Sequence, residues 1–153
     1  MIEWLSIGRL AGWLGWKGKQ RARKWAGDRQ ARVDQTFGAV SPVKEFIRRA
    51  NPIAVSIESW SGEIETRLGG FESDWKRLRP PLIEAVDKHP SEEVQRLGND
   101  LAEDVEKLLM GLRFLASNLT DPDVKAAASQ SVNQRRDHAL ELVDDLIKKV
   151  RAY

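Results

Sequence analysis

The sequence predicts an all-α protein, a helical bundle of four to five helices centred on a long antiparallel helical hairpin at residues 91–151. Two observations lead to this fold class. Apolar residues recur at spacings of three and four along most of the chain, and no segment alternates strictly as a half-buried strand does. With 153 residues, the chain is long enough to bury a core as one domain.

Charge divides the chain. Residues 1–50 carry 11 Lys and Arg against 4 Asp and Glu, whereas residues 51–153 carry 14 against 19. We therefore expect a helical arm at residues 1–37, apolar and then basic, followed by a helical bundle at residues 38–153. A basic segment on an acidic body suggests a negatively charged partner for the arm, although the arm could also lie against the acidic helices of its own chain.

The start of the arm is predicted to dock on a membrane or on a protein surface. Residues 1–16 are mostly apolar or glycine, and only Glu3 and Arg9 are charged. A helix that is apolar all round is buried in protein or in lipid, and the sequence leaves both open. The expected docking residues are Trp4, Leu5, Ile7, Leu10, Trp13, Leu14 and Trp16. A glycine strip that would let another helix approach closely consists of Gly8, Gly12 and Gly15.

Residues 17–32 of the arm are basic, and the only acidic residue among them is Asp28. Tryptophan beside cations is typical of a membrane–water interface with anionic lipid, and the same cations would suit an acidic protein face. Nucleic acid is a third candidate, because a helix places Lys17, Arg21 and Lys24 on one side. The residues expected to bind an anionic partner are Lys17, Lys19, Arg21, Arg23, Lys24, Arg29 and Arg32.

Proline and glycine predict the breaks in the middle of the chain. A break at residues 38–42 precedes a short helix that begins at Ser41-Pro42, and Asn51-Pro52 repeats this start signal. From Ile53 an apolar stripe, with Trp60 as a core residue, is expected to end at residues 69–70, which are both glycine. The next helical face is interrupted at residues 80–81, which are both proline.

The hairpin is capped by Ser91 and, after a turn, by Asp121 ahead of Pro122. Gly98 and Gly111 lie inside its first helix, where glycine is unfavourable, so we expect another helix to approach closely there or the helix to kink. The seam of the first helix consists of Val94, Leu97, Leu101, Val105, Leu108, Leu112 and Leu115. A similar, weaker pattern in the second helix consists of Val124, Ala128, Val132, Ala139, Leu142, Leu146 and Val150.

A polar gap interrupts the second helix of the hairpin between Val132 and Ala139. An antiparallel fold brings Arg135 close to three carboxylates of the first helix. The charges then either pair across the seam, which would help to set the register, or form a solvated face. The three carboxylates are Glu103, Asp104 and Glu106.

Little in the chain suggests catalysis. Cysteine is absent, only two histidines are present, and no phosphate-binding, nucleophile-elbow or zinc-protease motif occurs. We therefore expect no enzyme, no metal, no cofactor and no small-molecule substrate. The favoured function is a helical assembly or adaptor subunit that forms a homo-oligomer or binds another protein. The alternatives are a peripheral or shallowly inserted membrane protein and, third, a nucleic-acid-binding subunit. We expect a cytoplasmic location, or the inner face of a membrane.

Overall fold

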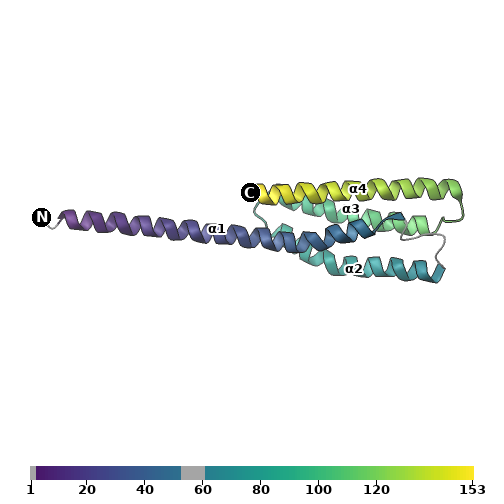
Figure 1. The fold of residues 1–153 in the computed structure, drawn as a ribbon, viewed down its shortest axis with the longest axis horizontal. Coiled ribbons are helices and arrows are strands. Elements are labelled where there is room, and N and C mark those ends of the chain that lie inside the picture. The colour runs from purple at the N-terminus through teal and green to yellow at the C-terminus, as the bar shows by residue number, and fades with distance from the viewer. Residues whose placement is uncertain (1–2, 53–60) are drawn as a thin grey trace. The chain divides into compact units, whose positions relative to one another are not determined.

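The computed structural model describes the backbone of residues 3–52 and 61–153, with side chains from residue 19 onward and again from residue 62. This part of the chain is all-α and contains no strand, so the predicted fold class is confirmed. Two compact units are present, one ending at Asp34 and the other running from Gln35 to Tyr153. The helices, labelled in Figure 1, are α1 (Glu3–Arg49), α2 (Ser61–Asp87), α3 (Glu92–Ala116) and α4 (Pro122–Ala152).

The core of the second unit is built from one face of each helix. α3 packs against both α2 and α4. Every predicted seam residue of α3 is buried, and in α4 only Val124 and Leu142 remain half-buried. Removing these side chains from water is the main favourable term for folding. The largest fully buried side chains are Phe46, Ile47, Leu68, Leu82, Leu101, Leu108, Leu112, Leu115 and Leu146.

The predicted break at residues 38–42 is wrong, because α1 continues through this segment to Arg49 with Pro42 inside the helix. Proline at this position removes the hydrogen bond to the carbonyl of Gly38 and costs a few kcal/mol. Burial of the apolar residues on either side of Pro42 compensates for this cost. Val40, Val43 and Phe46 are each 1% exposed or less, and tertiary packing of this kind overrides local propensity.

The predicted interruptions of the second helix are also wrong. α2 runs without a break through the glycines at residues 69–70 and the prolines at residues 80–81. Apolar side chains on both sides of these pairs are buried, among them Leu68, Trp75 and Leu82. Phe46 holds this helix to α1, with its ring 5.7 Å from Phe71 and 6.0 Å from Trp75 between centroids. The first part of the predicted stripe, from Ile53 to Trp60, lies outside the described residues, whereas Ile64 and Leu68 near its end are buried.

Both N-terminal caps predicted for the hairpin are confirmed, whereas the predicted helix start at Ser41-Pro42 is wrong because α1 continues through it. The Ser91 hydroxyl accepts a hydrogen bond from the backbone N–H of Val94 at 3.4 Å. The Asp121 carboxylate accepts from the N–H groups of Asp123 and Val124 at 3.1 and 3.2 Å, with Pro122 in the first turn. Each cap satisfies donors that the first turn of a helix leaves without a partner.

Close helix packing at the glycines of α3 is confirmed as well. A Cβ atom at Gly98 would lie 2.7 Å from the Cβ of Val86 on α2, far inside van der Waals contact. At Gly111, it would lie 3.3 Å from the Cγ2 of Val132 on α4. α3 therefore carries glycine where its backbone meets a neighbouring side chain, and the helical cost of glycine is offset by the tighter packing.

We expect Gly98→Ala to destabilise the bundle by about 1–3 kcal/mol, because the new methyl group overpacks against Val86. Gly69→Ala is the matched control. It lies inside α2 with open space around its missing Cβ, so it should stabilise the protein by up to about 1 kcal/mol. Urea unfolding of the two variants measures the difference.

Adding Val86→Ala to the Gly98→Ala chain should cost less stability than Val86→Ala alone, because the second substitution relieves the clash. Equal stability of Gly98→Ala and Gly69→Ala would contradict the close contact.

Candidate functional site

The backbone of the predicted docking residues is helical, since residues 4–17 lie within α1. Their side chains lie outside the described ones. The docking set, the glycine strip and Lys17 therefore stay predictions. The residues concerned are Trp4, Leu5, Ile7, Gly8, Leu10, Gly12, Trp13, Leu14, Gly15, Trp16 and Lys17.

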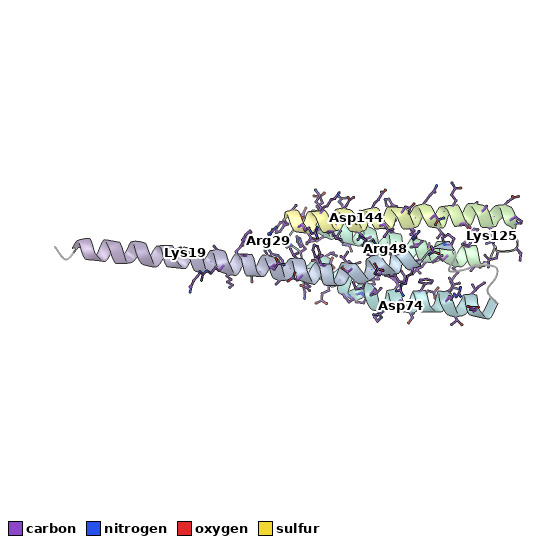
Figure 2. All side chains as sticks on the ribbon, in the orientation of Figure 1. Lys19, Arg29, Arg48, Asp74, Lys125 and Asp144 are labelled. Carbon is purple, nitrogen blue, oxygen red and sulfur yellow. The ribbon has the colours of Figure 1, made fainter. Side chains whose placement is uncertain are left out.

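The basic segment is described from residue 19 onward, and its side chains differ in burial. Lys19, Arg21, Arg23 and Lys24 are exposed, whereas Arg29 and Arg32 are half-buried. Figure 2 labels Lys19 and Arg29 on α1. A row of solvated cations on a helix is available to an anionic partner.

Trp25 is 61% exposed in the middle of this basic segment. An α-helix has 3.6 residues per turn, so Arg21 lies one turn before Trp25 and Arg29 one turn after it on the same face. Arg32 follows on this face. We call these four residues the Trp25 face. The docking residues predicted from the sequence did not include Trp25, although its i ± 4 spacing to two arginines was a signal that could have identified it.

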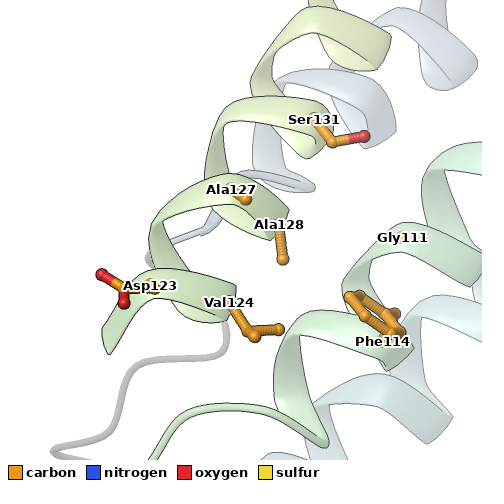
Figure 3. Close-up of a pocket in the computed structure, with 7 residues that line it drawn as sticks. All are labelled: Gly111, Phe114, Asp123, Val124, Ala127, Ala128 and Ser131. Carbon is orange, nitrogen blue, oxygen red and sulfur yellow. The ribbon is translucent and has the colours of Figure 1, made fainter. Parts of the chain in front are cut away.

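A second exposed apolar feature lies on the bundle, between α3 and α4 near the turn that joins them. It is an open hollow of about 470 Å³, which we call the apolar groove (Figure 3). Phe114 of α3 and Val124 of α4 project into it from opposite sides. The groove is lined by Gly111, Phe114, Asp123, Val124, Ala127, Ala128 and Ser131.

Large apolar side chains remain in solvent beside this groove. Phe114 is 55% exposed, and Met110, one turn earlier on the same face of α3, is 67% exposed. Soluble proteins seldom leave large apolar side chains clustered in water unless they bind something. The groove was missed in the sequence because Met110 and Phe114 lie off the periodic seam and resemble ordinary surface positions.

The polar gap of α4 lies opposite a buried carboxylate. Asp104 is 5% exposed, and one of its oxygens is 3.4 Å from Nη1 of Arg135, while the other is in hydrogen-bond contact with Nδ1 of His138. We call these three residues the Asp104 cluster. The predicted pairing of Arg135 across the seam is thus found with Asp104 alone. The other two carboxylates form ion pairs elsewhere, Glu103 with Lys107 and Glu106 with Arg79.

In the Asp104 cluster, the α3 residue is buried, whereas the two α4 residues are partly exposed. The side chains of Arg135 and His138 are 40% and 57% exposed, against 7% for the Asp104 side chain. An Asp–His pair orients an imidazole, but hydrolysis by such a pair also requires a nucleophile and donors for an oxyanion. The shallow hollow beside His138 is lined by charged groups and Leu142, with no hydroxyl or thiol. We interpret the cluster as structural.

Within residues 3–52 and 61–153, no group of three or more His, Asp or Glu residues is arranged to hold a metal ion. No helix of this part of the chain has a stretch apolar and long enough to cross a membrane.

The chain matches no protein-family profile, no curated protein and no solved structure.

We expect Asp104→Asn to destabilise the protein by about 1–3 kcal/mol, because it weakens the charge-assisted contacts of Arg135 and His138 with a buried acceptor. Glu103→Gln is the matched control on the neighbouring, exposed position of α3. It should change the free energy of unfolding by no more than about 0.5 kcal/mol. Chemical denaturation compares the two, and equal effects would contradict a structural role for Asp104.

Proposed function

We propose that this chain is a non-enzymatic helical assembly subunit whose N-terminal arm docks on a hydrophobic protein surface, either on a second copy or on another protein. The Trp25 face is the observation that carries the proposal. Tryptophan and arginine together dominate the binding energy of many protein interfaces, because each offers a large contact area and a specific polar group. Here both are placed on one face of a helix, with Trp25 mostly in solvent.

The organisation of the second unit supports a binding role for the arm. Residues 35–153 bury their own apolar core from four helical segments. In contrast, all described side chains from Lys19 to Asp28 are exposed. The preceding apolar residues, which include three tryptophans, would gain free energy from burial in an interface. The basic segment would then contact an acidic face of the partner.

The absence of cysteine fits a reducing compartment. We therefore propose a cytoplasmic location for the assembly subunit.

Leu10→Asp in the full chain should abolish assembly, because a carboxylate in the apolar part of the arm is costly to bury. Ala31→Asp, an exposed position on the same helix, is the matched control and should leave assembly intact. Light scattering after size exclusion measures the mass, which should fall to the 17.3 kDa of one chain only for Leu10→Asp. A Leu10→Asp chain that keeps the full mass would contradict docking through the arm.

A membrane surface is the second candidate partner, and the Trp25 face favours it as well. The indole ring partitions to the headgroup region, and the neighbouring arginines attract anionic lipid at about 1 kcal/mol per charge near the surface. Such an arm would lie in the interface, and the protein would then be found at the inner face of the membrane.

Flotation with vesicles of anionic and of neutral lipid tests this candidate. We expect the full chain to float only with anionic vesicles. Replacing Trp13 and Trp16 with Ala should abolish the binding, whereas Phe114→Ala, an exposed aromatic of the bundle, should not. Flotation that does not change when both tryptophans are removed would rule out insertion of the arm.

A further inference from the structure

We propose that the apolar groove is the receptor for the N-terminal arm of a second copy of this chain. The inference rests on the proposed function and adds to it the surface on which the arm docks. It joins two parts of the chain that need burial, the apolar start of α1 and the groove between α3 and α4.

The groove has the form of a helix-binding surface. Its α4 wall runs from Val124 to Ser131, a length of about two helical turns. Ala127, Ala128 and Ser131 on this wall are small, so an incoming helix can approach the backbone of α4 closely. Phe114, on the α3 side of the groove, supplies apolar area that is now in water.

The arm offers the complementary surface. Its sequence has glycine at residues 8, 12 and 15, which on a helix form a strip without side chains. A helix with such a strip packs closely against small residues, and the large side chains on either side of the strip then contact the rims of the groove. Leu10, Leu14 and the tryptophans of the arm would supply the large apolar side chains for these contacts.

Charge favours the encounter between the two parts. The unit that ends at Asp34 holds 8 Lys and Arg against 3 Asp and Glu, while the unit from Gln35 to Tyr153 holds 17 against 20. Opposite net charges attract the arm of one copy to the bundle of another. Asp123, at the start of α4, adds a carboxylate to the lining of the groove itself.

Docking of the arm of one copy in the groove of another allows two kinds of assembly. Two copies that insert their arms into each other form a closed pair with two identical contacts, whereas arms that dock in sequence form an open chain. Either arrangement requires both the arm and the groove, so substitutions in either part should prevent assembly.

Ala127→Arg blocks the groove with a long cation, and Ala126→Arg is its matched control. Both positions are exposed on α4, but only Ala127 lines the groove. We expect Ala127→Arg to raise the protein concentration at which half of the chains are assembled by about tenfold or more. Ala126→Arg should leave this concentration unchanged. Light scattering over a dilution series measures both, and thermal unfolding shows that the variants are folded. Phe114→Glu, at another exposed lining residue, provides an independent block.

Mixing two defective full-length chains tests whether the arm and the groove are partners. The Leu10→Asp chain keeps its groove, and the Ala127→Arg chain keeps its arm, so each alone should be monomeric while the mixture forms a 1:1 complex. Recovery of the complex supports the proposal. Assembly of Ala127→Arg and Phe114→Glu at the wild-type concentration overturns the groove assignment but leaves the proposed function standing if Leu10→Asp still fails to assemble.

If Leu10→Asp also assembles normally, both the groove assignment and docking through the arm are overturned. A wild-type chain that is monomeric across the dilution series overturns docking between copies, whereas an arm that binds another protein would remain testable with that protein. A mixture of the two defective chains that stays monomeric, while the wild type assembles, shows that the arm and the groove do not bind each other.

Discussion

The packing of α3 against two neighbours at once is the constraint on which the rest of the bundle depends. Its seam residues are buried, and its backbone contacts Val86 of α2 and Val132 of α4 at the two glycines. Apolar burial supplies most of the free energy, but it is non-directional and would allow several helix arrangements. The close contact at Gly98 is more selective, because the glycine lets the side chain of Val86 reach the backbone of α3 there.

The Asp104 cluster adds selectivity between α3 and α4. A buried carboxylate without partners is costly, so a slip of one helical turn that separated Asp104 from Arg135 and His138 would be penalised. Replacing such a group with an apolar residue of similar size often leaves stability unchanged or raises it. The value of the cluster therefore lies in choosing one register for a seam that is otherwise built of similar aliphatic side chains.

The second unit buries an apolar core but leaves an apolar groove on its described surface. Ion pairs join neighbouring helices at the surface of the bundle, for example Arg113 of α3 with Glu72 of α2. The hydrogen bond from Arg113 to the Glu72 carboxylate raises the pKa of the Arg113 guanidinium. The lining of the apolar groove is largely apolar, and its exposed Phe114 resembles part of the uncovered half of an interface. In the first unit, Trp25 is likewise a large apolar side chain that lies mostly in solvent. These exposed apolar side chains, in two units of opposite net charge, are the physical basis of the proposed self-assembly.

The fold class, the seam of α3 and both caps of the hairpin were determined by the sequence itself, whereas at Gly98 the sequence left close packing and a kink as alternatives. Each depends on local chemistry or periodicity. The caps require a hydroxyl or carboxylate before the first turn of a helix, and the seam requires apolar residues at spacings of three and four. The breaks predicted at Pro42, at the glycines of residues 69–70 and at the prolines of residues 80–81 were not observed, because burial on both sides of each signal outweighs the local cost. Only the tertiary structure decided which of three neighbouring carboxylates meets Arg135 and where apolar side chains stay in solvent. Both depend on the register and spacing of helices far apart in the chain, which no local pattern records.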